Sequence, residues 1–179
     1  MNTWKSFAAN EVTHSVAHYL TTLFDLHSRR GYARVSDVAK ELDVTKGSVS
    51  VQMKHLKEKG LVIEDENRFL RLTPSGEVIA REVMHNRQIL IQFINVVLGV
   101  PQDRAEIDAC KIEHLLSRET SHQLLALVQL LQSDDPEACR LRERFREYKV
   151  SCPNIENCSL CSVECLAAED RGGEHRSDH

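Results

Sequence analysis

Apolar residues near the start of the chain recur at steps of three and four, which is the period of one face of an α-helix. They are Val16, Tyr19, Leu20, Leu23 and Leu26. The pattern predicts an amphipathic helix over residues 11–27, with this face turned toward a core.

Two shorter helical patterns follow, separated by only Asp43 and Val44. Ser36 and Thr45 precede them, and a Ser or Thr hydroxyl at a helix start accepts a hydrogen bond from a free backbone amide. The apolar positions of the two patterns are Val38, Ala39, Leu42, Val49, Met53 and Leu56. Two short helices with such a tight connection predict a helix-turn-helix.

Two apolar runs then predict a pair of short strands, at residues 61–63 and 69–72, joined by an acidic turn. A helix start follows at Thr73 and Pro74, because proline is tolerated at the first helical position and threonine can cap the free amides. The strand pair after the two helices predicts a winged helix-turn-helix.

The remaining chain shows mostly helical patterns, at residues 74–98, 103–116 and 118–132 and after Pro136. The sequence therefore predicts a mainly α fold in three parts. These parts are a winged helix-turn-helix DNA-binding domain at 1–73, a helical domain at 74–148 and a cysteine-rich segment at 149–179. The polar end of the last part is expected to be unfolded.

Composition and charge narrow the class of protein. No apolar run approaches the roughly 20 residues that cross a bilayer, and the first residues lack the apolar stretch of a secretory signal, so we expect a cytoplasmic protein without a membrane partner. The net charge is −4, but residues 1–60 hold nine Lys and Arg against six Asp and Glu. This asymmetry permits nucleic-acid binding by the first domain. No nucleophile–base pair or phosphate loop indicates an enzyme.

DNA recognition by a helix-turn-helix comes from the first turns of its second helix. The exposed polar residues expected there are Thr45, Lys46, Ser48, Ser50 and Gln52. Lys54 and Lys57, further along, are candidates for phosphate contacts. An ordinary solvated face is the alternative for each lysine alone.

Cys110, Glu113 and His114 are spaced i, i+3 and i+4 on a predicted helix. This spacing places three donors of different type on one face within one turn, as a chelating site requires. The alternative is a small buried cysteine beside two solvated side chains.

The chain resembles the diphtheria toxin repressor and manganese transport regulator family over roughly residues 12–132. The resemblance lies in GYARVSDVAKEL, GSVSVQMKHLKEKGLV, LTPSGEVIA and DACKIEHLLS. It implies a transcriptional repressor that binds double-stranded operator DNA as a homodimer, with a divalent ion as corepressor. The domain at 74–148 would then bind metal and form the dimer.

The resemblance also implies a fourth metal ligand, His18, because the family has a ligand immediately before Tyr19. The implied set is His18, Cys110, Glu113 and His114. These donors suit Fe(II), Co(II), Ni(II) or Zn(II) better than Mn(II), and Fe(II) is favoured because the cysteine-containing motif resembles the iron-responsive branch. His14, one turn before His18, could assist but is expected to be a surface residue.

One position departs from the family pattern. Related proteins place a histidine of a second, ancillary metal position where this chain has Arg87, so a second ion is not expected. A guanidinium cannot ligate a cation. We expect Arg87 to neutralise Glu106 or another carboxylate near the first site.

Four further cysteines lie within fourteen residues, in the pattern C-x5-C-x2-C-x3-C: Cys152, Cys158, Cys161 and Cys165. The spacing favours an iron–sulfur cluster, with a zinc ion as the main rival and reactive thiols or disulfides as the remaining reading. An alternative function follows, a redox or iron–sulfur sensing transcription factor that this cluster controls.

Overall fold

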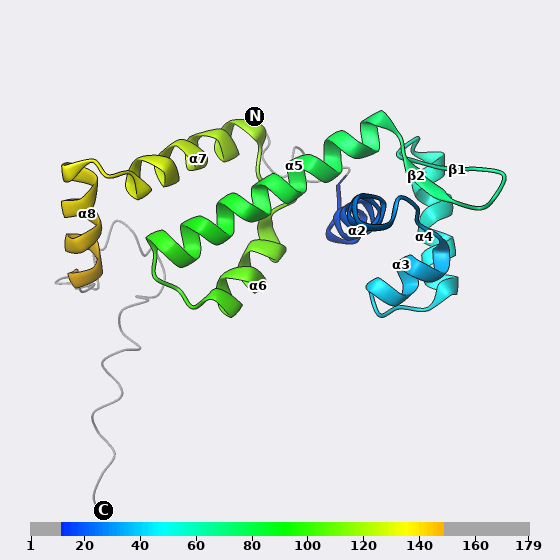
Figure 1. Ribbon diagram of the computed structural model, residues 1–179, viewed down its shortest axis with the longest axis horizontal. Helices are drawn as coiled ribbons and strands as arrows, with labels where there is room; N and C mark the ends of the chain where they lie inside the picture. Colours follow the sequence, from blue (N-terminus) through cyan, green and yellow to red (C-terminus); the bar gives the residue numbers. More distant parts are fainter. Residues whose placement is uncertain (1–11, 149–179) are drawn as a thin grey trace, which may run out of the picture.

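The computed structural model describes residues 12–148 and arranges them as two lobes joined along one long helix, α5 (Pro74–Ile91) (Figure 1). The first lobe contains α2 (His14–Arg30), α3 (Val35–Glu41), α4 (Lys46–Glu58), β1 (Val62–Glu64) and β2 (Leu70–Leu72). The second lobe contains η1 (Gln92–Val97), α6 (Gln102–Ile112), α7 (Arg118–Gln132) and α8 (Pro136–Glu147). The predicted mainly α fold with a winged helix-turn-helix is confirmed.

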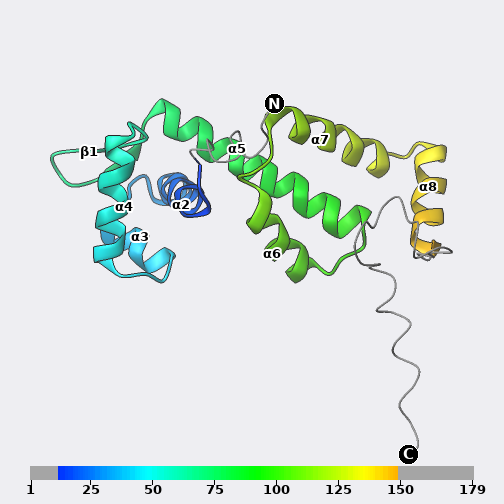
Figure 2. The same cartoon turned by 180° about the vertical axis from the view of Figure 1, so that it is seen from behind.

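The two strands form an antiparallel hairpin in which Val62 lies opposite Leu72 and Ile63 opposite Arg71. Its loop projects from the end of the first lobe, away from the second lobe (Figure 2). Val62 and Leu70 are fully buried and hold the hairpin against the helices. This hairpin is the wing that the sequence predicts.

Side-chain caps fix the helix starts. Thr45 accepts a hydrogen bond from the amide of Ser48 at 3.1 Å, and Thr73 accepts one from the amide of Gly76 at the same distance. The expected cap at Ser36 is wrong, because α3 begins at Val35 and its N-cap is Arg34, two residues before Ser36. The carboxylate of Asp37 accepts the Arg34 amide hydrogen at 3.0 Å, and a charged acceptor makes the stronger bond.

The core of the first lobe consists of the apolar helix faces that the sequence predicts. Its buried residues include Tyr19, Leu20, Leu23, Leu26, Val38, Val49, Met53 and Leu56. Helix α5 starts directly against this core. A Cβ atom on Gly76 would lie much closer than 3.0 Å to the carbonyl oxygen of Leu61, and real Cβ atoms do not approach other atoms so closely. Only glycine therefore allows this approach.

The second lobe differs from the expected helices at two ends. The helix predicted at 74–98 is α-helical only to Ile91 and continues as the π-helix η1 before the chain reverses at Gly99, where φ is 74°. Helix α6 ends at Ile112 rather than residue 116, and Glu113 is its C-cap. A small core of Leu90, Ile94, Ala105 and Ala109 holds α5, η1 and α6 together.

Candidate metal centre

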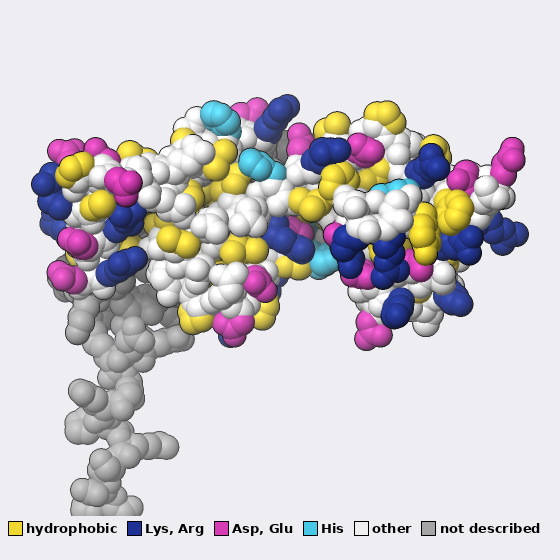
Figure 3. Space-filling model, in the orientation of Figure 1, with side chains coloured by type: hydrophobic (Ala, Val, Ile, Leu, Met, Phe, Trp, Pro, Cys, Tyr) yellow, Lys and Arg dark blue, Asp and Glu magenta, His cyan; other side chains and the backbone are white. Residues whose placement is uncertain are grey.

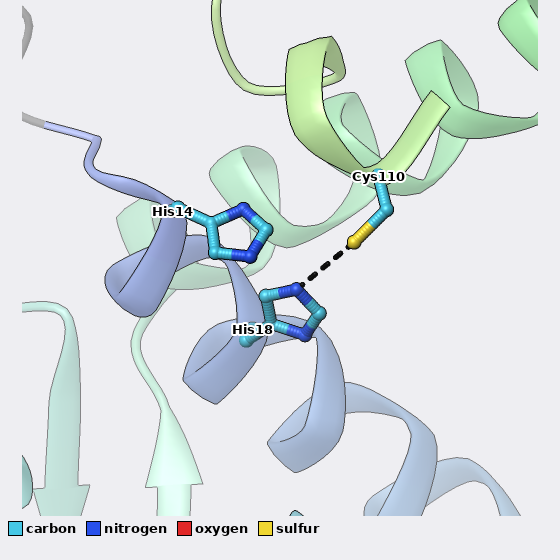
Figure 4. Close-up of side chains that lie close together, drawn as sticks. All are labelled: His14, His18 and Cys110. Atoms are coloured by element: carbon cyan, nitrogen blue, oxygen red, sulfur yellow. Dashed lines mark hydrogen bonds between the residues drawn. The ribbon is translucent and has the colours of Figure 1, made fainter. Parts of the chain in front are cut away.

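Helices α2 and α6, from different lobes, face each other beside α5, and their side chains meet in Figure 4. The Nε2 atom of His18 lies 3.2 Å from the Sγ atom of Cys110, which is 92 residues further along the chain. His14 lies one helical turn before His18 and points to the same place. One donor atom from each of the three side chains lies within 4.8 Å of the other two.

This donor group is open to solvent on one side. His14 is exposed, whereas His18 and Cys110 are half-buried. The rings of His14 and His18 are 4.4 Å apart in an edge-to-face arrangement, and the ring of His114 lies 5.3 Å from that of His14. Three imidazoles and one thiol therefore gather where the two lobes meet.

Glu113 makes a different contact. Its side chain is only 1% exposed, and Arg87 on α5 holds both of its carboxylate oxygens. The Nε of Arg87 donates to Oε2 at 2.6 Å, and Nη2 donates to Oε1 at 3.2 Å. Asn86 donates to the backbone carbonyl oxygen of Glu113 at 2.9 Å and so fixes the end of α6.

Burial and charge decide the protonation of these groups. Burial raises the pKa of Glu113, although the hydrogen bonds and charge of Arg87 act in the opposite direction. Burial lowers the pKa of Arg87, but its hydrogen bonds and charge contacts with Glu113 and Cys110 outweigh this effect, so the pKa is raised. The guanidinium stays charged and contacts both side chains.

Burial, followed by the charges of His14, Arg87 and His114, lowers the pKa of His18 below its ordinary value. A neutral imidazole keeps a nitrogen lone pair available for a metal ion. Nitrogen and sulfur donors at this separation suit a first-row transition ion, which binds imidazole at about 2.0–2.1 Å and thiolate at about 2.3 Å in the case of zinc. The residues present therefore fit such an ion.

The structure brings together only part of the expected ligand set. His18 and Cys110 meet, whereas Glu113 pairs with Arg87 and His114 lies beside His14. Glu113 keeps the helical hydrogen bond of α6, since its amide donates to the carbonyl oxygen of Ala109 at 2.9 Å, but its side chain contacts Arg87 and lies outside the donor group that contains Cys110.

His14, expected to be an ordinary surface residue, belongs to the donor group. Its i, i+4 spacing to His18 was the signal in the sequence. The carboxylate next to Arg87 is that of Glu113, whereas Glu106 accepts a hydrogen bond from Gln102 at 2.8 Å.

The expected DNA-reading residues lie on or before α4, and all are exposed except the half-buried Gln52. Several already have partners: Thr45 and Ser48 share a hydroxyl contact of 2.9 Å, and Gln52 donates to Ser15 on α2 at 2.9 Å. Lys57 pairs with Glu64 of the wing. Lys and Arg side chains gather over this lobe (Figure 3).

Comparison with known proteins places these two lobes in one family. Residues 11–70 match the family described as iron dependent repressor, N-terminal DNA binding domain, and residues 73–141 match iron dependent repressor, metal binding and dimerisation domain. The chain belongs to the iron-dependent repressor family. The resemblance seen in the sequence is thereby confirmed.

Curated relatives of this family cover most of the matched region. The chain is 32% identical to the HTH-type transcriptional regulator MntR of Lysinibacillus sphaericus over 122 residues, which are 68% of this chain and 87% of that protein. It is also 32% identical to MntR of Bacillus subtilis over 123 residues, 69% of this chain and 86% of the relative. Both relatives are transcriptional regulators.

Solved structures show the same fold. IdeR of T. acidophilum matches with a TM-score of 0.55 and 26% identity, over 65% of this chain and 54% of that chain. The manganese regulator SloR matches with a TM-score of 0.58 and 22% identity, over 63% and 53%. The chain thus spans about half the length of these two proteins.

Membership of the iron-dependent repressor family does not support the alternative of an iron–sulfur or redox sensor. The cysteines of that alternative, Cys152, Cys158, Cys161 and Cys165, lie beyond both matched ranges and outside the residues that the structure describes. The second metal centre therefore stays a prediction. Within residues 12–148, no helix is long and apolar enough to span a bilayer.

Proposed function

We propose that this family member is a repressor that binds double-stranded operator DNA as a homodimer when a divalent transition ion ties α2 to α6. The contact of 3.2 Å between His18 and Cys110 carries the proposal, because it joins a helix of the DNA-binding lobe to one of the metal-binding lobe. We place this activity in the cytoplasm and keep the boundaries 1–73, 74–148 and 149–179 for the three parts of the chain.

The donor chemistry favours Fe(II), Co(II), Ni(II) or Zn(II) over Mn(II), and the resemblance of the cysteine-containing motif to the iron-responsive branch puts Fe(II) first. His18 and Cys110 would hold the ion, and His14 and His114 lie next to them. Glu113 would reach the ion only by giving up its contacts with Arg87. The ion supplies a link between two helices that otherwise share one hydrogen bond at this point.

Regulation then follows from a shift in population between two arrangements of the lobes. His18 and Cys110 would bind the ion best when α2 and α6 are close, so occupancy favours the arrangement in which α4 is held at a fixed distance from the dimer interface. Lys54 and Lys57 would contact phosphates, whereas the polar residues of the first turns of α4 would face the bases.

The test is an electrophoretic mobility shift with the operator under anaerobic conditions, in chelator and with each of five ions. We expect binding to strengthen with Fe(II), Co(II), Ni(II) and Zn(II), and His18→Ala and Cys110→Ala to abolish this increase. His122→Ala is the matched control, because His122 is an exposed histidine on α7 outside the donor group. Equal binding in chelator and in metal would disprove the proposal.

A further inference from the structure

The side chain of Arg87 lies between solvent and the buried carboxylate of Glu113. Its side chain is 37% exposed, whereas the Glu113 side chain that it binds is 1% exposed. A groove of about 600 Å³ opens on this side and is lined by His14, Arg87 and Cys110, together with Asp103 and Glu106. His18, Glu113 and His114 do not line it.

An ion that enters this groove therefore meets nitrogen and sulfur donors before any oxygen of Glu113. His14 and Cys110 are the nitrogen and sulfur donors in the groove lining. Its two acidic side chains, Asp103 and Glu106, are matched by two basic ones, Arg87 and Lys111. The carboxylate lies behind a guanidinium that already uses both of its oxygens. Glu113 is also not part of the group whose donor atoms lie within 4.8 Å of one another.

We propose that Arg87 withholds Glu113 from the metal and thereby sets which ion this protein selects. The ion is then held by His14, His18 and Cys110, so the donors are two imidazoles and one thiolate. This assignment rests on the proposed function, since it concerns the same centre. Arg87 is a positioning residue, because its guanidinium binds the carboxylate and never the ion.

Two physical consequences follow. Hard Mn(II) binds best to oxygen ligands, so withholding a carboxylate lowers its affinity more than that of ions that accept nitrogen and sulfur. In addition, Glu113 can change partner only by giving up both hydrogen bonds from the guanidinium, which then lies next to a divalent ion without this carboxylate, and like charges at short range in a half-buried site repel. Arg87 therefore opposes both the exchange and the binding of a second ion beside the first.

The decisive experiment uses a pair of substitutions that leaves the local charge unchanged. Arg87→Gln together with Glu113→Gln removes one positive and one negative group. Dissociation constants for Zn(II), Co(II) and Mn(II) are measured anaerobically on the full chain by competition with a fluorescent chelator. We expect the Zn(II) and Co(II) constants of this double variant to stay within about threefold of wild type. We expect His14→Ala, which removes a ligand, to weaken both at least about tenfold, since even the loss of an outer partner of a ligand costs about 10- to 100-fold.

The single variant Arg87→Gln frees the carboxylate, so we expect Mn(II) to bind at least about tenfold more tightly, as an added ligand would require. The matched control is Glu77→Gln with Arg81→Gln, because this ion pair of 3.3 Å lies on the same helix and contacts no donor. The spectrum of bound Co(II) adds a separate readout. Its thiolate charge-transfer band should disappear in Cys110→Ser and persist in the double variant.

The outcomes separate the two proposals. If wild type binds none of these ions, both the proposed function and this inference are wrong. If wild type binds them and the double variant loses clearly more than about threefold in Zn(II) and Co(II) affinity, this inference is wrong while the proposed function stands. An unchanged Mn(II) constant in Arg87→Gln, with the variant folded by circular dichroism, would equally overturn the inference.

Discussion

Replacing Gly76 with alanine tests how the wing is joined to the long helix. Gly76 lies in the first turn of α5, and the added Cβ would overlap the carbonyl oxygen of Leu61 and lie 3.1 Å from its carbonyl carbon. This oxygen already accepts the amide hydrogen of Thr73 at 3.0 Å. Because the obstacle is backbone on both sides, no side chain can rotate away to relieve it.

The expected cost is the difference between two effects. Overpacking against a rigid neighbour costs about 3 kcal/mol at the upper end of its usual range. Alanine gains about 1 kcal/mol over glycine from helix propensity. Gly76→Ala should therefore lower the free energy of unfolding by about 2 kcal/mol. Gly47→Ala is the control, because Gly47 lies in α4, its nearest atom is 3.8 Å away, and it should gain about 0.4–1 kcal/mol.

Urea unfolding followed by circular dichroism measures both values, in chelator and at one fixed protein concentration, because metal and dimerisation would shift the midpoint. With a slope of about 2 kcal/mol per molar urea, the Gly76→Ala midpoint should fall by about 1 M. A change in unfolding free energy of less than about 0.5 kcal/mol in Gly76→Ala, or the same sign in both variants, would refute this account of the junction.

Three other predictions concern charge and metal. Lys54→Ala should weaken binding to operator and random DNA alike and reduce the salt slope by about 0.9, whereas Arg140→Ala, on α8 and paired with Glu137, should do neither; salt titrations of both duplexes decide this. The metal-free protein should lose stability as pH falls below 6.5, because burial lowers the pKa of His18 and His114 in the folded state and the unfolded chain then binds the proton more readily. His18→Gln should flatten that part of the pH profile, and an unchanged slope would contradict the assignment. Anaerobic protein should lose one metal centre when serine replaces the four cysteines of residues 149–179, which are Cys152, Cys158, Cys161 and Cys165. Analysis of acid-labile sulfide then separates an iron–sulfur cluster from a zinc ion.

Most of the fold could be predicted because it depends on local signals. The apolar period of α2 and the threonine caps of α4 and α5 act within a few residues, so they are visible in the sequence. The end of α6 is not, because it depends on Asn86, which reaches from α5 to the carbonyl oxygen of Glu113. The π-helix η1 was not predicted either, because the apolar residues of 92–97 do not distinguish it from a continued α-helix.

The candidate site was predicted in part for the same reason. Cys110 followed from its helical spacing to Glu113 and His114, whereas His18 followed from a family resemblance, which encodes the packing of α2 against α6 indirectly. The bond between Arg87 and Glu113 joins two helices at a separation of 26 residues, and no local rule relates such positions. His14 had the right spacing to His18, but its role needed the position of α6.

Helix α5 has a mechanical consequence, because one continuous helix joins the wing to Arg87, the residue that contacts Glu113 beside the metal centre. Its 18 residues measure about 27 Å at a rise of about 1.5 Å per residue. A tilt of about 5° at the end near Arg87 would move the end near Thr73 by about 2 Å, which approaches the base-pair step of about 3.4 Å. A displacement of this size means that a rearrangement too small to disturb either core is enough to move the DNA-binding lobe into or out of register with the major groove of DNA.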